Sequence, residues 1–289
     1  MAEISAQAVK ALREQTGAGM MDCKRALSEA AGDFDKAALV LRERGLAKAG
    51  KREGRATSEG LIAIANAGNA GAMVELGCET DFVARTDDFQ ELGRSLAEAV
   101  AADPALAGVE PLLAAEIGGT PVSETIKAAI AKLGENVVVK RVARIELPGG
   151  GVVGGYVHAG GKLGVLVGLS SSEGSDLSAL AKDVAMHVAA ADPSPVAVSR
   201  EGVPAELLAS ERDIYRKQAL KEGKPEKILD RIVEGKLAKF VSDICLVEQA
   251  FVKDPDKSVG DLLKQAGQVS VFAFERFRLG QSAEETVPE

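Results

Sequence analysis

The sequence has no tryptophan, and aromatic residues make up only 3% of the chain. Its hydrophobic cores must therefore be built mainly from Ala, Val, Leu and Ile. Cysteine is also scarce: Cys23, Cys78 and Cys245 lie far apart and form no C-x-x-C pair. Such a set predicts neither a disulfide framework nor a zinc site, and it is typical of a reducing compartment.

Long apolar runs are missing as well. The start of the chain has no basic segment leading into an apolar stretch, and no window approaches the roughly 18 apolar residues of a membrane span. We expect a soluble, cytoplasmic protein without a membrane partner.

Positive charge is in the minority, since 35 Lys and Arg oppose 43 Asp and Glu and leave a formal net charge of -8. Nucleic-acid binding relies on clustered Lys and Arg that neutralise phosphates, so a protein partner is expected and a nucleic-acid partner is not. The 289 residues reach the size, about 250 to 300 residues, at which a single core stops growing. More than one domain is therefore predicted.

Catalytic groups are few. The two histidines, His158 and His187, belong to no ligand motif, and no nucleophile, base and metal ligand stand together in the pattern. His187 lies in the apolar stretch Val184–Val188, which favours a packed or capping histidine over a catalytic one. We predict that the protein is not an enzyme and that it holds no cofactor or metal.

Two glycine-rich stretches have part of a nucleotide-binding motif. Gly149–Gly154 has the spacing G-x-G-x-x-G, but the residues after it predict a strand instead of the helix that would hold a pyrophosphate. Gly161 and Lys162 are followed by Leu163, and Tyr156 stands where a P-loop needs its first glycine. We interpret the first stretch as a hairpin turn and expect no direct nucleotide binding.

Residues 4–45 predict a small bundle of three helices. Apolar residues at helical spacing mark them, and Asp33 is a natural N-cap for the third. Gly17, Gly32 and Gly45 stand where each helix is expected to stop.

Residues 46–60 change in composition and contain four basic side chains without an apolar stripe. These are Lys48, Lys51, Arg52 and Arg55. We interpret the segment as a solvated linker, with an RNA contact as the alternative.

The middle of the chain predicts sheet, helices, sheet and helix in that order. β-type runs at 61–66 and 72–76 flank turn residues and predict a hairpin. Helices are then expected at 88–102, 122–133 and 177–190, and strands at 137–147, 152–158 and 163–169. The helix ends Glu98–Pro104 and His187–Pro193 resemble each other, which suggests two similar subdomains, although an Asp-Pro pair ends many helices.

Residues 204–245 predict an antiparallel pair of helices, broken at Glu222–Pro225. A protruding pair would expose apolar surface unless it met a partner, so a homodimer through this hairpin is a hypothesis. A strand at 269–277 completes a sheet, and the polar tail 281–289 is predicted to be disordered.

The segment Cys78–Arg85 is unusual because it places an acid and a large aromatic side chain between a strand and a helix. A structural interpretation is that Thr80 or Asp81 caps the helix while Phe82 packs beneath it. The alternative is that the segment contacts a partner.

Several stretches resemble the elongation factor Ts family in the same order. The run Thr16–Lys24 followed by Thr80–Ala84 is similar to the paired signature of that family. Further similar stretches are Leu133–Asn136 with Arg141 and Val142, Tyr156–His158 with Gly164–Val167, Met186–Ala190, Gly223–Pro225, Val233–Gly235 and Phe251–Pro255. They cover nearly the whole chain, which makes the resemblance far more specific than one short motif.

The resemblance implies an α+β fold. Its expected parts are an N-terminal three-helix module similar to a ubiquitin-associated domain, a core of two similar α+β subdomains with antiparallel sheets, and an inserted helical hairpin. The expected boundaries are 1–55 for the module with its linker, 56–150 for the first subdomain, 151–200 with 246–280 for the second, 201–245 for the hairpin and 281–289 for the tail.

The resemblance also implies a guanine nucleotide exchange factor that binds elongation factor Tu with GDP and promotes GDP release during translation elongation. Thr80, Asp81, Phe82 and Val83 would disturb the Mg²⁺ and phosphate site of that partner, with Phe82 as a wedge. The other expected partner contacts are Leu12, Met20, Met21, Leu133 and His158.

Two other functions stay open. A ribosome- or RNA-associated protein without exchange activity would use the basic linker. An enzyme would use the thiol of Cys23 or Cys78, although no base or metal partner stands near either thiol in the pattern.

Overall fold

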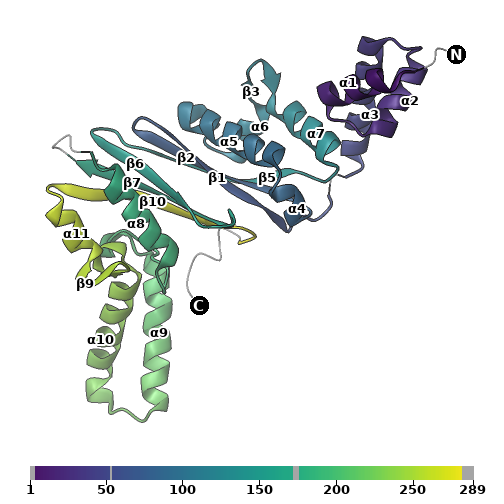
Figure 1. Ribbon diagram of the computed structural model, residues 1–289. Coiled ribbons are helices and arrows are strands. Elements are labelled where there is room, and N and C mark those ends of the chain that lie inside the picture. The colour runs from purple at the N-terminus through teal and green to yellow at the C-terminus, as the bar shows by residue number, and fades with distance from the viewer. Residues whose placement is uncertain (1–3, 53, 172–175, 282–289) are drawn as a thin grey trace. The chain divides into compact units, whose positions relative to one another are not determined.

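The computed structural model describes residues 4–52, 54–171 and 176–281 (Figure 1). Within them the chain forms two compact units. The first comprises residues up to Ala63, Met73–Ala143 and Gly160–Lys162, and the second comprises Ile64–Ala72, Arg144–Ala159 and the residues from Leu163 onward. None of the helices in these ranges is long and apolar enough to cross a membrane. Apart from Gln281, the tail predicted to be disordered lies outside the described residues.

Three helices begin the first unit: α1 (Ala6–Thr16), α2 (Met20–Glu29) and α3 (Phe34–Gly50). The side chains of Ser5 and Asp33 cap α1 and α3, and Gly17 ends α1 with a left-handed φ of 67°. The core of the bundle consists of Val9, Leu12, Cys23, Ala26, Leu27, Ala37 and Leu41. The three predicted helices are confirmed, while the likeness to a ubiquitin-associated domain stays a prediction.

The predicted end of the third helix at Gly45 is wrong, because α3 continues to Gly50. Gly45 lies in the interior of α3, where a Cβ atom would stand 2.7 Å from the Cβ of Ala131. The glycine therefore permits close contact with a neighbouring helix and does not end its own.

The sheet that follows has three strands in the order β1 (Glu59–Ala67), β2 (Ala70–Cys78) and β5 (Val138–Glu146). Gly68 and Asn69 form the short loop of the β1–β2 hairpin, and Gly68 has a φ of 62°, as such tight turns require. The predicted hairpin and third strand are confirmed.

Between β2 and β5 lie α4 (Asp81–Ala84), α5 (Asp87–Ala102) and α7 (Val122–Leu133). α5 packs closely on β1, since a Cβ on Gly93 would stand 2.8 Å from Cδ1 of Leu61. No elements were predicted for residues 103–121. The structure has four there: a 3-10 helix (Pro104–Leu106), α6 (Val109–Ala114), β3 (Glu116–Ile117) and β4 (Thr120–Pro121).

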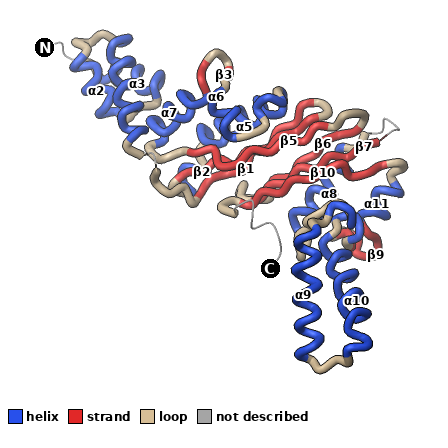
Figure 2. Tube along the Cα trace, turned by 180° about the vertical axis from the view of Figure 1, so that it is seen from behind, coloured by secondary structure: helices blue, strands red, loops and turns tan. Residues whose placement is uncertain are grey.

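The second unit contains an antiparallel sheet in the order β10 (Val269–Arg278), β7 (Leu163–Ser171) and β6 (Gly151–Val157). α8 (Ser178–Ala190) covers one of its faces (Figure 2). β6 begins at Gly151, so Gly149 and Gly150 lie in the turn before a strand, as predicted. In both sheets a hairpin is joined by a later strand beside its second strand, and a helix follows the hairpin, so the prediction of two similar α+β subdomains is confirmed.

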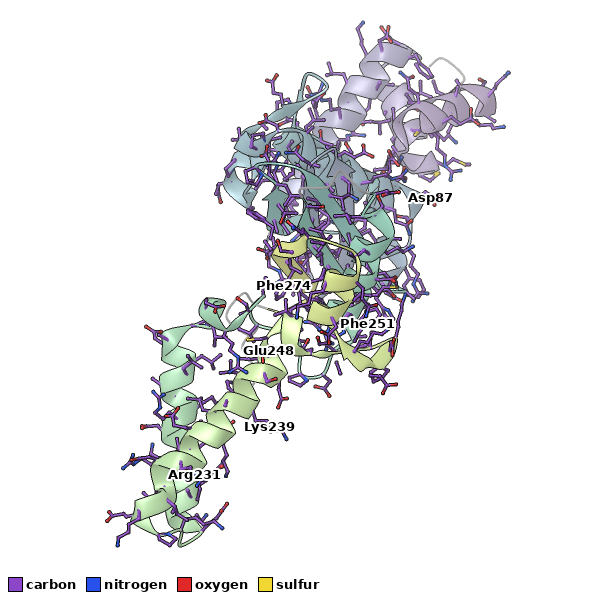
Figure 3. All side chains as sticks on the ribbon, turned by 90° about the vertical axis from the view of Figure 1, so that its left-hand side faces the viewer. Asp87, Arg231, Lys239, Glu248, Phe251 and Phe274 are labelled. Atoms are coloured by element: carbon purple, nitrogen blue, oxygen red, sulfur yellow. The ribbon has the colours of Figure 1, made fainter. Side chains whose placement is uncertain are left out.

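Two long helices, α9 (Ala205–Lys221) and α10 (Glu226–Ile244), follow α8 in the chain and run antiparallel side by side (Figure 1). Their contact buries Ala219, Leu229, Val233 and Leu237. Figure 3 shows Arg231 and Lys239 along α10, with Glu248 at the base of the hairpin. The inserted helical hairpin is thus confirmed, while the homodimer through it stays a hypothesis.

Residues 246–268 contain elements that the pattern did not reveal. They are a 3-10 helix (Leu246–Glu248), β8 (Ala250–Phe251), β9 (Asp254–Ser258) and α11 (Val259–Gln265), and a further 3-10 helix (Arg200–Gly202) precedes α9. Leu246, Phe251, Val259 and Leu263 join α8 and the sheet in one core. The domain boundaries expected from the sequence stay predictions.

Candidate functional site

The signature segment begins where β2 ends. Thr80 has an extended backbone (φ -129°, ψ 155°), and its hydroxyl oxygen accepts a hydrogen bond from the N–H of Val83 at 3.4 Å. Thr80 is therefore the cap of α4, and Asp81 instead forms an ion pair with Arg85 at 2.9 Å. The single turn of α4 leads directly into α5, which Thr86 caps in the same way.

Phe82 is 80% exposed, so the interpretation that it packs beneath the helix is wrong. Val83 and Phe89 are buried and occupy that side instead. Successive residues of a helix are rotated by about 100°, so burying Val83 turns its neighbour outward. The structure therefore presents a large apolar side chain to solvent on a capped turn.

A carboxylate from a distant part of the chain holds this segment. Glu135 lies in the connection from α7 to β5, and its Oε2 accepts hydrogen bonds from the N–H of Glu79 at 3.1 Å and of Thr80 at 2.9 Å. Its Oε1 accepts the hydroxyl of Thr80 at 2.6 Å. Hydrogen bonds to an ionised acceptor are among the stronger ones in proteins, so the backbone ahead of Phe82 is firmly anchored.

Glu79, directly after β2, in turn binds the backbone of the connection that contains Glu135. Its Oε1 accepts the backbone N–H of Asn136 at 2.7 Å, and this hydrogen bond, together with the Arg55 guanidinium 3.4 Å away, lowers the pKa of the Glu79 carboxyl. The buried side chain of Asn136 donates to the carbonyl oxygen of Arg55 at 2.9 Å. We call Glu79, Thr80, Glu135 and Asn136 the clasp, because each of the two connections binds the backbone of the other.

Leu133 and Gly134 direct the chain into the clasp. Leu133 is the last residue of α7 and is half-buried. Gly134 ends the helix with a left-handed φ of 82° and donates its N–H to the carbonyl oxygen of Ile130. The signature stretches Thr80–Ala84 and Leu133–Asn136, far apart in sequence, are thus in direct contact.

The other expected contact residues are spread over the chain. Met20 and Met21 at the start of α2 are 55% and 65% exposed, whereas Leu12 is fully buried in the core of the three-helix bundle. His158 belongs to the second unit, where it is exposed and its Nδ1 lies 3.0 Å from the hydroxyl of Tyr156.

The packed interpretation of His187 is confirmed. Its side chain is buried, the N–H of Val252 donates to Nδ1 at 3.2 Å, and Nε2 lies 3.0 Å from Oε1 of Gln249. Burial lowers the pKa of this histidine, although the hydrogen bond to Gln249 opposes the shift. Both ring nitrogens are occupied by structural hydrogen bonds.

The thiols have the wrong surroundings for nucleophilic chemistry. All three cysteines are buried and free. Burial, reinforced by the charge of Glu135, raises the pKa of the Cys78 thiol to about 11. Reactive cysteines have lowered pKa values in electropositive, accessible surroundings. The part of the chain that the structure describes contains no group of His, Cys, Asp and Glu that could hold a metal ion.

Two basic residues of the linker make contacts within the protein. Arg55 pairs with Glu79, and Nη1 of Arg52 donates to the carbonyl oxygen of Ile130 at 3.3 Å. These contacts occupy side chains on which the RNA interpretation depends.

Sequence reasoning selected Leu133 but missed Glu79, Glu135 and Asn136. An acid directly after the helix-ending Gly134 was a usable signal, because a carboxylate at the C-terminus of a helix is disfavoured by the helix dipole and therefore suggests an interaction elsewhere. Its partner was hidden because the hydrogen bonds join residues more than fifty positions apart.

The sequence is similar to known proteins over nearly its whole length. Residues 79–281 match the family model described as Elongation factor TS. The chain is 48% identical over 285 residues to Elongation factor Ts of Arthrobacter sp. (strain FB24), covering 97% of this chain and 100% of that protein. It is 44% identical over 291 residues to Elongation factor Ts of Chlorobium phaeobacteroides (strain BS1), covering 97% of this chain and 100% of that protein. It is 47% identical over 283 residues to Elongation factor Ts of Thioalkalivibrio sulfidiphilus (strain HL-EbGR7), covering 97% of this chain and 94% of that protein.

Proposed function

This chain belongs to the elongation factor Ts family, and we propose that it is a guanine nucleotide exchange factor that binds elongation factor Tu with GDP and promotes GDP release in translation elongation. Thr80, Asp81, Phe82 and Val83 act on the Mg²⁺ and phosphate site of the partner. The protein works in the cytoplasm by binding alone, without a catalytic residue or cofactor of its own.

The exposed side chain of Phe82 carries this proposal. The exposed ring of Phe82 contributes little to the stability of the free protein, whereas burying it in a partner contributes about 1.5 to 3 kcal/mol to binding. Aromatic side chains are frequent anchors of protein interfaces. Because the clasp holds the backbone ahead of Phe82, little ordering remains to be done when the partner binds.

Exchange requires no bond to be made or broken. If Phe82 occupies a position on the GTPase that is accessible only when GDP and Mg²⁺ are displaced, this protein binds the nucleotide-free form more tightly than the GDP form. By linkage it then weakens GDP binding by the same factor. Loss of Mg²⁺ adds to this effect because the phosphate charge is less well neutralised.

The remaining expected contacts have distinct parts in the proposal. Met20 and Met21 offer an exposed and adaptable apolar surface for docking. Leu12 supports that surface from the core beneath it, and Leu133 and His158 add contacts from the two units.

The test is release of a fluorescently labelled GDP from purified elongation factor Tu. Wild-type protein is expected to accelerate release, and Phe82→Ala to reduce that acceleration about thirtyfold, as expected for a lost contribution of about 2 kcal/mol. Phe272→Ala is a matched control, because Phe272 is also an exposed phenylalanine (49%). It should accelerate release like wild type, and Phe82→Ala should leave the melting temperature unchanged.

Wild-type acceleration by Phe82→Ala would refute the role of Phe82. No acceleration by the wild-type protein would refute exchange activity altogether. RNA binding that weakens steeply with salt, without any effect on GDP release, would support the ribosome- or RNA-associated alternative.

A further inference from the structure

Glu135 lies outside the segment that presents Phe82, but its carboxylate accepts hydrogen bonds from that segment. Three donors within two consecutive residues, the N–H groups of Glu79 and Thr80 and the hydroxyl of Thr80, converge on its carboxylate. The same hydroxyl oxygen accepts from the N–H of Val83, so the carboxylate, the cap and the turn of α4 form one continuous chain of hydrogen bonds. Phe82 lies within that turn.

From these contacts we propose that Glu135 is a positioning residue, which holds Phe82 in the orientation that nucleotide exchange requires. This inference rests on the proposed function. Glu135 acts through Phe82 and need not touch the partner itself.

The reciprocal hydrogen bonds of the clasp explain how Glu135 can position Phe82. Glu79 binds the backbone of Asn136 at 2.7 Å in return, so the two connections fix each other at two points. Without Glu135, the N–H groups of Glu79 and Thr80 lose their acceptor, and the short segment is free to adopt other conformations. If the other contacts dock the protein whether or not Phe82 is positioned, the fraction of bound molecules ready to insert Phe82 then falls, and the maximal exchange rate falls with it.

A purely structural role makes a different prediction. If Glu135 only stabilised the fold, its removal would lower the melting temperature and would affect exchange equally whether or not Phe82 were present. If it positions Phe82, its effect on exchange must disappear once Phe82 is truncated. A double-mutant cycle separates the two cases.

The experiment measures labelled-GDP release from elongation factor Tu over a range of concentrations of the full-length protein. Glu135→Ala is expected to lower the maximal rate about tenfold, as the loss of charged hydrogen bonds implies, with a small change in half-saturation. Glu135→Gln should restore most of the rate, because its amide oxygen still accepts both N–H groups. Glu91→Ala is the control, since Glu91 forms only an exposed ion pair with Arg94 in the first unit and should leave exchange unchanged.

The decisive comparison places Glu135→Ala in the Phe82→Ala background, where no further loss is expected. Hydrogen exchange of the free protein should show faster exchange at the Glu79 and Thr80 amides in Glu135→Ala and unchanged exchange in the bundle of α1–α3. If Glu135→Ala fails to fold, Glu135→Asp takes its place, because it keeps the charge but withdraws the carboxylate by one bond of about 1.5 Å. It should show the same dependence on Phe82 with a smaller loss.

A wild-type maximal rate in Glu135→Ala, or in Glu135→Asp where that variant takes its place, would overturn the positioning role. An equal loss with and without Phe82 would overturn it as well. Failure of the proposed function is a separate result: there the wild-type protein itself does not accelerate release, or Phe82→Ala is as active as wild type.

Discussion

Acidification below about pH 6.5 is expected to destabilise the second unit through His187. The N–H of Val252 donates to Nδ1, so this nitrogen must be unprotonated, and Nε2 then carries the proton and donates to Gln249. Gln249 in turn donates to the carbonyl oxygens of Pro193 and Asp243. The neutral ring thus links α8 with the end of α10 and the residues that follow it.

The sign and size of the effect follow from linkage. The folded pKa of His187 lies below the ordinary value of 6.5 because burial disfavours the charged ring. The unfolded chain therefore binds more protons as the pH falls, and the stability present above pH 6.5 is lost down to the folded pKa. The slope is at most about 1.4 kcal/mol per pH unit. The carboxyls with lowered pKa values, such as Glu79 and Asp261, act only below about pH 4.5, so they do not contribute to the loss of stability between pH 6.5 and 4.5.

Imidazole NMR can test this directly because the chain contains only two histidines. Spectra of His187→Gln assign the signals of the two rings. We expect His187 in the tautomer with the proton on Nε2, with a titration midpoint below 6.5, and a loss of unfolding free energy between pH 6.5 and 5 in urea titrations. That loss should be absent in His187→Gln. A midpoint at or above 6.5, or the opposite tautomer, would contradict the hydrogen bond from Val252.

Two further predictions concern buried groups. The thiol of Cys78, with its pKa of about 11, should be about a thousandth ionised at pH 8. Alkylation followed by mass spectrometry should therefore find it nearly unmodified under native conditions. Glu135→Gln should increase the alkylation rate, and rapid alkylation of the wild-type thiol would refute the burial argument. Gly154→Ala should destabilise the protein by about 1 to 3 kcal/mol in urea unfolding, because the new Cβ would stand 2.5 Å from the Cβ of Ala181. Gly235→Ala on α10 is its control, since nothing lies near the added atom there and a gain of about 0.5 to 1 kcal/mol is expected. An unchanged free energy of unfolding in Gly154→Ala would show that α8 does not pack closely on β6.

Local patterns predicted the longer elements well. The helix expected at 122–133 is α7 with the same bounds, since its apolar residues recur at helical spacing and Gly134 ends it. Elements of two residues, such as β3, β4 and β8, have no periodicity to detect, and α6 and α11 are too short to show one clearly. The prediction that the third helix ends at Gly45 was wrong because a glycine that ends a helix and a glycine that admits a neighbouring helix look alike in sequence. Only the contact with Ala131 in the folded structure distinguishes the two.

The candidate site was located by resemblance to a family signature, but its architecture was not. The cap at Thr80 was among the options because capping depends on residues three positions apart. Whether Phe82 lay under the helix or in solvent depended on which neighbour filled the space below, and there the structure places Val83 and Phe89.

The sequence by itself determined the α+β class, the helical hairpin and the family, and it singled out the segment that is proposed to act on the partner, since each depends on residue type and local spacing. The tertiary structure decided that Phe82 is exposed and that Glu135 anchors the backbone ahead of it. The physical reason is that exposure and hydrogen-bond partners depend on which distant residues meet. Thr80 and Glu135 are 55 positions apart, and only the folded first unit brings the donors of one to the carboxylate of the other.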